Sequence, residues 1–337
     1  MTDVVSTTAG YFPRPDYLIE TLKDVQGYQK QDMGPEAEEK VEDVFHEGRK
    51  DVIGVQESAG IDVVTEGQLS WDDIIAFPAT RVDGVEMGGI KRFYDNNRFY
   101  REPQVVDELT HSGEITVGQY EDAVGVASEG VKPVMAGPYS LARLSKNDHY
   151  DSREEYRGAL ADAVNEELRA LSDAGAETVQ MDEPSLTGVN DEGVDVDDGI
   201  ETIERSLEGV DADVVVTTYF GEITDAYPRL LDVADGVGID LVSGEENIEA
   251  VEEYGADGSL AVGCMDARNT RLEPVDELVG TVNDVLDRAE PETTYVSPSA
   301  GLDFLPWTVM EEKGHRLGEA TEGGGGEWDT TDSSPRL

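Results

Sequence analysis

The stretch Thr178-Val179-Gln180-Met181-Asp182-Glu183-Pro184-Ser185-Leu186 decides the fold of this chain. A short, mostly apolar run is typical of a buried strand, and this one ends in two adjacent carboxylates followed by a proline. Charges at the carboxyl end of a buried strand need a polar cavity or hydrogen-bonding partners. Asp182 and Glu183 are therefore candidate catalytic residues. A strand exit in which they only bind the backbone of the next loop explains the pattern equally well.

Similar runs alternate with longer amphipathic segments along the whole chain. The candidate strands end near Tyr11, Thr65, Gly137, Glu183, Phe220, Val242, Asp266 and Ser299, and helical patterns cover residues 35–59, 152–174, 245–253 and 274–289. Eight β/α units predict an α/β fold, a single-domain (β/α)8 TIM barrel over residues 1–320. The alternative is an open doubly wound sheet. It needs a glycine-rich phosphate loop after an early strand, which residues 9–15 do not provide.

Two segments depart from this rhythm. Residues 68–106 carry six aromatic side chains and no β/α pattern, so we expect an insertion packed over the barrel mouth. Residues 321–337 contain four consecutive glycines and almost no apolar side chains, so we expect a disordered acidic, glycine-rich tail without chemistry.

The charge of the chain is extreme. It has 25 Lys and Arg against 75 Asp and Glu, a formal net charge of -50. Molar salt shortens the Debye length to roughly 3 Å and makes such a surface tolerable, so we interpret the chain as a halophilic protein. An acidic surface also argues against nucleic acid as a partner.

Cysteine content and hydropathy indicate the compartment. Cys264 is the single cysteine, so an intrachain disulfide is excluded, and the N-terminus has no signal-peptide pattern. No apolar run approaches the ~20 residues that span a bilayer. We expect a soluble protein of a high-salt cytoplasm, without membrane partners.

Several strand-end segments follow one another in a characteristic order. They are Phe12-Pro13-Arg14, Gly89-Ile90-Lys91-Arg92-Phe93-Tyr94-Asp95-Asn96-Asn97-Arg98-Phe99-Tyr100, Val215-Val216-Thr217-Thr218-Tyr219-Phe220, Asp266-Ala267-Arg268-Asn269 and Pro298-Ser299-Ala300-Gly301-Leu302. In this order the chain resembles the cobalamin-independent methionine synthase family, whose members carry two related barrels in one polypeptide. The resemblance runs from Thr7 to about Gly318, the length of one barrel. The segments are similar to the N-terminal barrel, which does not hold the catalytic zinc.

The resemblance implies methyl transfer to homocysteine bound as a thiolate on zinc, which lowers the pKa of the thiol. The family's metal ligands fall here on Thr218, Phe220, Asp240 and Ala300, and Arg268 replaces its proton-donating histidine. A phenylalanine and an alanine offer no lone pair, so we expect no zinc in this chain. Asp240 remains a weak candidate ligand.

Cys264 is the other weak candidate ligand. It lies two residues before Asp266 on a predicted strand, so the two side chains share a face. No histidine lies near either residue in the sequence. A lone cysteine in an apolar strand is more often a small core residue.

The resemblance also implies substrate contacts. Arg14 and Lys91 are candidates for binding the carboxylates of a folate polyglutamate tail, although a structural ion pair explains each equally well. Asp182 matches a carboxylate that holds the amino group of homocysteine in the catalytic barrel. Asp182 and Glu183 can also serve only the hydrogen bonding of the barrel.

We therefore predict a protein of methionine biosynthesis that transfers a methyl group from 5-methyltetrahydrofolate, or a related one-carbon donor, to homocysteine. We expect it to act with a second, zinc-bearing barrel subunit. One alternative is a non-catalytic folate-binding or scaffold subunit. Another is a uroporphyrinogen decarboxylase-like enzyme of the same superfamily, which needs basic residues such as Arg14, Arg92, Arg98 and Arg101 for a polycarboxylate.

Overall fold

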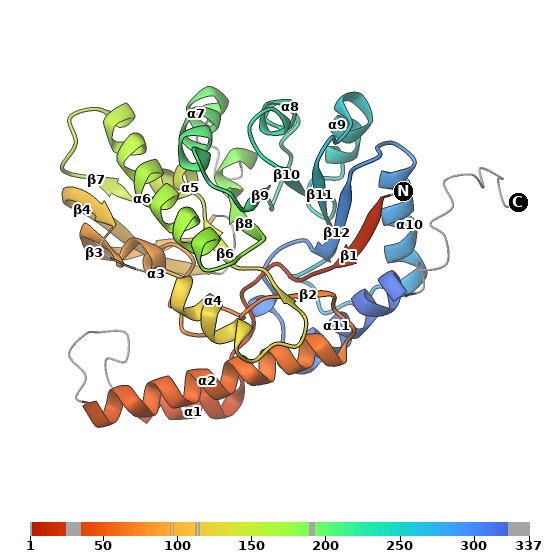
Figure 1. The fold of residues 1–337 in the computed structure, drawn as a ribbon, viewed down its shortest axis with the longest axis horizontal. Helices are drawn as coiled ribbons and strands as arrows, with labels where there is room; N and C mark the ends of the chain where they lie inside the picture. The colour runs from red at the N-terminus through yellow and green to blue at the C-terminus, as the bar shows by residue number, and fades with distance from the viewer. Residues whose placement is uncertain are drawn as a thin grey trace, which may run out of the picture.

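Eight parallel strands form the centre of the molecule in the computed structural model, which describes residues 2–24, 35–94, 96, 98–111, 113, 115–188 and 193–322 (Figure 1). They are β1 (Asp3–Ser6), β2 (Val63–Val64), β6 (Val134–Ala136), β8 (Thr178–Asp182), β9 (Asp213–Thr217), β10 (Gly236–Asp240), β11 (Ser259–Met265) and β12 (Thr293–Pro298). Seven of them end within three residues of the predicted strand ends, whereas β1 ends at Ser6, five residues before Tyr11. The prediction of a (β/α)8 barrel is confirmed.

The strand order shows how the barrel closes. Seven strands pair in the order β1-β12-β11-β10-β9-β8-β6. β2 bridges the remaining gap, because Thr7 pairs with Val63 on one side and the Lys132 amide donates to the Val64 carbonyl at 2.9 Å on the other. Sequence neighbours are therefore spatial neighbours around a ring, which excludes the open doubly wound sheet with its reversal of strand order.

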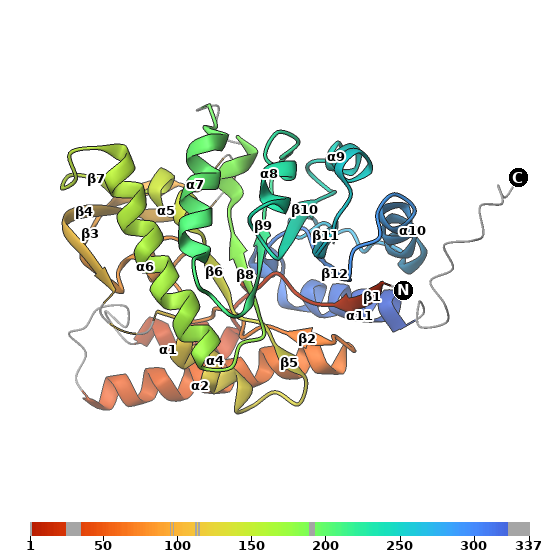
Figure 2. The same cartoon turned by 45° about the horizontal axis from the view of Figure 1, so that its top comes forward.

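Helices surround the strands in both views (Figures 1 and 2). They are α1 (Asp16–Asp24), α2 (Pro35–Ser58), α4 (Val117–Val124), α5 (Pro138–Leu144), α6 (Arg153–Asp173), α7 (Val196–Leu207), α8 (Tyr227–Leu231), α9 (Asn247–Tyr254), α10 (Val275–Leu286) and α11 (Trp307–Glu322). Side chains cap the N-termini of two of these helices: Ser152 accepts from the Glu155 amide at the start of α6, and Asp195 accepts from the Asp198 amide at the start of α7. Each satisfies a backbone donor that the first helical turn leaves open.

The predicted insertion contains a long antiparallel hairpin. After the short helix α3 (Ala76–Ala79), β3 (Val82–Arg92) pairs with β4 (Phe99–His111), and β7 (Lys146–Asn147) adds in parallel to β4. The hairpin lies beside α6, away from β1 and α10 (Figure 2). It ends at His111, beyond the expected boundary at residue 106.

Apolar side chains fill the space between strands and helices. All five residues of β10 are buried, as expected for a parallel strand covered on both faces. Helices in the described ranges lack the combination of length and apolar character that crossing a membrane requires. The predicted tail lies outside the described residues, apart from its first two positions, which end α11.

Candidate functional site

A cavity of about 540 Å³, open solvent included, lies at the carboxyl ends of the barrel strands. The last residue of β8 and the segments after β1, β2, β9 and β12 line it, and the turn end of the β3–β4 hairpin contributes Phe93, Arg98, Phe99 and Tyr100. Part of the predicted insertion therefore does reach the barrel mouth. In (β/α)8 barrels this end carries the active site, because the loops there can vary without disturbing the strands. We take this cavity as the candidate active site.

Asp182 is one of four carboxylates that line this cavity, with Asp72, Asp73 and Asp303. It is the last residue of β8 and lines the cavity, while its Oδ1 accepts from Gln180 Nε2 at 2.8 Å. Burial raises the pKa of Asp182 to about 7, against the lowering effects of Gln180 and of Lys132. A buried carboxyl with a raised pKa beside a cavity is a common mark of a functional site.

Glu183 points the other way and serves the backbone. Its carboxylate accepts from the amides of Tyr139 at 2.8 Å and Ser140 at 2.7 Å, and from the Ser140 hydroxyl at 2.6 Å. These donors begin α5, and the carboxylate packs over Gly137, where any side chain would collide with it. Burial raises the pKa of Glu183 to about 7. The contacts describe a helix-start anchor, one of the two roles considered for this residue.

Aromatic rings cover one wall of the cavity. Phe220 meets Phe93 edge to face at a centroid distance of 6.4 Å, and its centroid lies 6.2 Å from that of Tyr94 and 6.4 Å from that of Phe304. Three residues in this region have left-handed backbone: Tyr11 (φ 33°), Tyr94 (φ 49°) and Phe220 (φ 74°). Non-glycine residues adopt this conformation at an energetic cost, which surrounding structure offsets most often at ligand sites.

An ion pair joins the hairpin to the segment after β12. The Arg98 guanidinium pairs with the Asp303 carboxylate and also lies over the Phe304 ring, 4.5 Å from its centroid. Burial raises the pKa of Asp303 to about 7, although Arg98 lowers it. Both residues line the cavity, so the site contains a positive and a negative group next to aromatic faces.

Arg14 and Lys91 do not line the cavity. Arg14 donates from Nε to the Leu69 carbonyl and from Nη2 to the Trp71 carbonyl, each at 2.7 Å, and so ties the loop after β1 to the insertion. Lys91 is exposed on β3 and faces Glu102 at 3.7 Å. Lys91 thus has the ion pair considered for it, whereas these contacts of Arg14 are hydrogen bonds to backbone carbonyls. Their proposed contacts with a folate tail stay a prediction.

The four positions that match the family's zinc ligands do not fit a metal. Thr218 Oγ1 donates to the Gly238 carbonyl at 2.9 Å, and Phe220 and Ala300 supply only carbon. Asp240 accepts from the backbone amides of Phe220, Val242 and Ser243 at 2.8–2.9 Å. Within the described ranges, no three His, Cys, Asp or Glu side chains group as a metal site. A carboxylate fully occupied by amides is a structural anchor.

Cys264 lies in the core of β11. Its Sγ is 3.8 Å from the Ser297 carbonyl, and burial raises the pKa of the thiol to about 12. Metals bind the thiolate, which this environment disfavours. Cys264 is therefore a buried core residue, as the alternative interpretation predicted, and its role as a weak candidate ligand stays a prediction.

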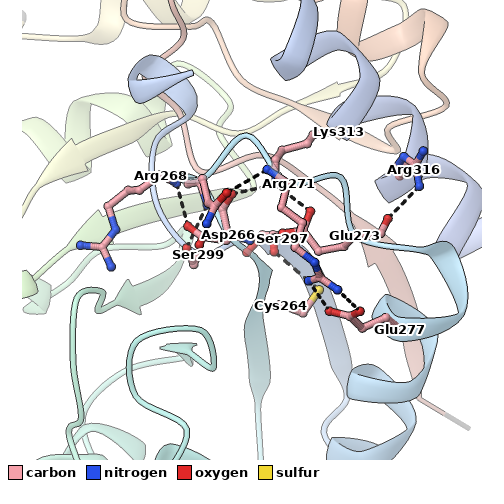
Figure 3. A network of polar contacts seen from close by, with 12 residues as sticks. Cys264, Asp266, Arg268, Arg271, Glu273, Glu277, Ser297, Ser299, Lys313 and Arg316 are labelled. Atoms are coloured by element: carbon pink, nitrogen blue, oxygen red, sulfur yellow. Dashed lines mark hydrogen bonds and ion pairs between the residues drawn. The ribbon is translucent and has the colours of Figure 1, made fainter. Parts of the chain in front are cut away.

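A buried ion pair holds the loop after β11. Lys313 on α11 donates to Glu273 Oε2 at 2.6 Å and to the Asp266 carbonyl at 2.9 Å (Figure 3). The same loop carries Arg268, which Figure 3 shows pointing away from this network. Its guanidinium lies over the Phe220 ring at 4.6 Å and donates to Ser243 at 2.6 Å. The residue at the family's histidine position thus rests on the aromatic wall.

Sequence reasoning missed several of these contacts. Lys132 is hydrogen-bonded to Gln180, which is hydrogen-bonded to Asp182. Arg98 pairs with Asp303, which lies 205 residues later in the sequence. Strand alternation could have placed Gln180 on the same face as Asp182. The ion pair of Arg98 with Asp303 has no signal in the sequence around either residue.

Comparisons with known proteins agree with this architecture. The family model described as the catalytic domain of the cobalamin-independent synthase matches residues 4–322. A methionine synthase from Sulfurisphaera tokodaii is 30% identical over 310 residues, covering 91% of this chain and 88% of that protein. One from Saccharolobus solfataricus is 27% identical over 320 residues, covering 94% and 93%. These relatives therefore also have about the length of one barrel.

Solved structures show the same fold. A B12-independent methionine synthase from Shewanella sp. W3-18-1 superposes with a TM-score of 0.77 at 22% identity, covering 94% of this chain and 96% of that chain. A putative one from Listeria monocytogenes gives a TM-score of 0.74 at 14% identity, covering 97% and 99%. The matching family model is that of the catalytic domain, whereas the strand-end motifs of this chain resemble the barrel without zinc. The chain belongs to the cobalamin-independent methionine synthase family.

Proposed function

We propose that this chain acts in methionine biosynthesis, in methyl transfer from 5-methyltetrahydrofolate, or a related one-carbon donor, to the sulfur of homocysteine. The observation that carries the proposal is Asp182, a buried carboxylate that lines the mouth cavity and is held on one oxygen by Gln180. A carboxylate in this position is a suitable acceptor for the ammonium group of an amino acid. The Shewanella protein was solved in complex with selenomethionine, an amino acid with the same group.

The other cavity residues suit a folate-type donor. Phe93, Tyr100 and Phe304 offer ring faces and edges on which a flat heterocycle can stack. Arg98 lies among them and can bind a carboxylate of the donor if Asp303 is protonated or displaced. Arg14 and Lys91 remain proposed contacts for the glutamate tail, with Lys91 the more accessible of the two.

Binding of both substrates is the first test. In high-salt buffer, isothermal titration is expected to show binding of L-homocysteine and of 5-methyltetrahydrofolate triglutamate. Asp182→Asn is expected to weaken homocysteine binding by at least about tenfold, because a charge-assisted hydrogen bond is lost, and to leave folate binding unchanged. Asp197→Asn, an exposed surface carboxylate on α7, is the matched control. If wild-type protein bound neither ligand, the proposal would be wrong. Binding of folate alone would favour a folate-binding subunit.

We also propose that a second barrel subunit supplies the zinc. On that subunit zinc would lower the pKa of the homocysteine thiol, for which the matching positions here offer no ligand set. Single-barrel length by itself does not call for a partner, since the curated relatives share it. The support comes from the side chains at those positions and from the surface next to the cavity.

That surface lies at the turn end of the β3–β4 hairpin. Ile90 is 71% exposed and Phe99 is 62% exposed, and Phe99 also lines the cavity. Residues 89–102 contain four Lys or Arg and two acidic residues, a local charge of 4 − 2 = +2 in a chain of net charge -50. Of these, Lys91 faces Glu102 and Arg98 pairs with Asp303. An apolar patch inside a basic island suits the acidic surface of another halophilic protein.

Untagged purification from the native host in high salt tests the partner. We expect this chain to carry no stoichiometric zinc by mass spectrometry, and a co-purifying barrel of the same family to carry it. Recombination of the two chains should restore methyl transfer, and Ile90→Asp with Phe99→Asp should weaken their association. Ile19→Asp, at an exposed apolar position on α1, is the control. Zinc bound to this chain together with full activity alone would contradict the division of labour.

A further inference from the structure

Three polar side chains form a line inside the barrel and end at the cavity. Lys132 precedes β6, and Gln180 and Asp182 alternate along β8, so the last two share its inward face. Lys132 Nζ donates to Gln180 Oε1 at 2.7 Å, and Gln180 Nε2 donates to Asp182 Oδ1 at 2.8 Å. Each of the three residues is only 3% exposed.

The chemistry of the three groups gives this line a direction. A protonated lysine can only donate, so it must face the carbonyl oxygen of the Gln180 amide. The amide nitrogen is then turned toward Asp182, where its protons need an acceptor. An ionised carboxylate accepts on either oxygen, whereas a protonated carboxyl must also find an acceptor for its own proton. The arrangement therefore favours a charged Asp182.

Lys132 and Asp182 each oppose the effect of burial on the other's pKa. Burial lowers the pKa of Lys132 to about 7, and the charge that opposes this effect is Asp182. Besides Asp182, Lys132 faces the ring of Tyr295 at 5.8 Å. The charge of Asp182 also raises the pKa of Glu183 and of Tyr219. Lys132 is thus the cation that balances Asp182 in this part of the barrel.

The free oxygen of Asp182 is the functional consequence. Among the described residues, the hydrogen bond from Gln180 is the only one made to this carboxylate, so Oδ2 stays available to the cavity that Asp182 lines. A buried carboxylate without a nearby cation would take up a proton instead and lose its attraction for a cationic ligand.

We propose that Lys132 is a positioning residue that acts through the Gln180 amide and holds Asp182 as an ionised acceptor for the ammonium group of the amino-acid substrate. The substrate part of this inference rests on the proposed function. Lys132 itself does not line the cavity, so it acts on a ligand there only through Gln180 and Asp182. Its effect should therefore appear as selectivity for an ammonium group, not as a general loss of binding.

The selectivity test compares L-homocysteine with 4-mercaptobutanoic acid, which lacks only the amino group. In wild-type protein homocysteine should bind more tightly by isothermal titration. The selectivity ratio is the dissociation constant of 4-mercaptobutanoic acid divided by that of homocysteine. Lys132→Met and Gln180→Met should each reduce this ratio by about tenfold, the loss expected when a charged hydrogen bond is removed. The double variant should lose no more selectivity than either single variant, because both substitutions interrupt the same hydrogen-bonded line from Lys132 to Asp182. Lys146→Met, at an exposed lysine, should leave the ratio unchanged.

A second measurement does not depend on any ligand. With aspartate labelled at Cγ, the Asp182 resonance is identified by its absence in Asp182→Asn and titrated in wild-type protein and in Lys132→Met. Loss of the cation should raise the pKa of Asp182 above its value of about 7 in the intact protein. Near-UV circular dichroism verifies that each variant is folded. If Lys132→Met does not fold, Gln180→Met is titrated in its place.

The two measurements separate the two proposals. An unchanged titration, or an unchanged selectivity ratio in both folded variants, would overturn the role of Lys132. Failure of wild-type protein to bind homocysteine would contradict the proposed function, and a shifted titration would then still support the control of Asp182 by Lys132.

Discussion

Asp182 and Glu183 are adjacent in the sequence but face different environments. The inward side chain of Asp182 lines the cavity, whereas Glu183 turns outward to the first amides of α5. The two alternatives considered for this pair, a site in a cavity and an anchor for the next loop, are therefore divided between its members. Strand alternation is the cause, because successive side chains leave a strand on opposite faces.

Glu183→Gln should lower the free energy of unfolding by about 1–3 kcal/mol. The amide keeps one acceptor oxygen and turns an NH2 group toward donors, so at least one of the donors on Tyr139 and Ser140 loses its partner inside the protein. Urea denaturation in high salt measures the change. Asp197→Asn, at an exposed carboxylate, should leave stability unchanged within error. Equal stability of Glu183→Gln and wild type would show that the anchor is dispensable.

Between β11 and α10, the connecting loop depends on a helix that is distant in the sequence. Lys313, fully buried on α11, reaches Glu273 and the Asp266 carbonyl at the two ends of this loop. Arg316 on the next turn donates to the Glu273 carbonyl at 3.0 Å. Because the loop also carries Arg268 to the aromatic wall, α11 contributes to the shape of the cavity mouth without lining it.

Lys313→Met should destabilise the protein by about 3–5 kcal/mol, because it leaves the Glu273 carboxylate buried without its cation. Lys313→Met combined with Glu273→Met should recover much of this loss, since two apolar side chains replace the pair. Equilibrium unfolding in urea provides both values. Lys50→Met removes an exposed lysine that faces Glu47 and serves as the control. A double variant as unstable as the single one would assign the effect to packing and not to charge.

The charge of the whole molecule follows from composition. With 75 acidic and 25 basic residues, one-to-one pairing leaves 75 − 25 = 50 carboxylates without a cation. The surface ion pairs join exposed side chains, as Arg229 and Asp197 do, and such pairs contribute little to stability. Repulsion among the remaining carboxylates must then be weakened by the solvent.

The melting temperature should therefore rise strongly between about 0.1 M and about 1 M KCl, over which the Debye length falls from about 10 Å to about 3 Å. Differential scanning calorimetry measures the effect. Chloride and sulfate compared at equal ionic strength separate charge screening from the exclusion of sulfate from the protein surface. A melting temperature independent of KCl would rule out the halophilic interpretation.

Much of the fold could be predicted from the sequence because its signals are local. Most barrel strands are short, mostly apolar runs that end in a polar or small residue or are followed by one, and the helix patterns at residues 35–59 and 152–174 match α2 and α6 closely. The hairpin was harder. Its strands carry the alternation of an exposed ribbon, so only the aromatic side chains marked it as an insertion, and its end at His111 was missed.

The candidate site was predicted only in part. Asp182 was identified by its position at a strand end, while Arg14 and Lys91 proved to lie outside the cavity lining. Lys132 was missed because nothing near it in the sequence distinguishes a buried lysine from an exposed one. Its burial follows from the closure of the barrel at β2, where the Lys132 amide meets the Val64 carbonyl.

The sequence by itself determined the periodicity of the barrel, the charge of the surface and the atoms available at each strand end. An alanine at residue 300 and a phenylalanine at residue 220 cannot bind zinc in any conformation. Only the tertiary structure decided which groups meet, as in the line from Lys132 to Asp182 and in the pairing of Arg98 with Asp303. Periodicity and atom type belong to neighbouring residues, whereas these hydrogen bonds and ion pairs require strand register and barrel closure across the whole chain.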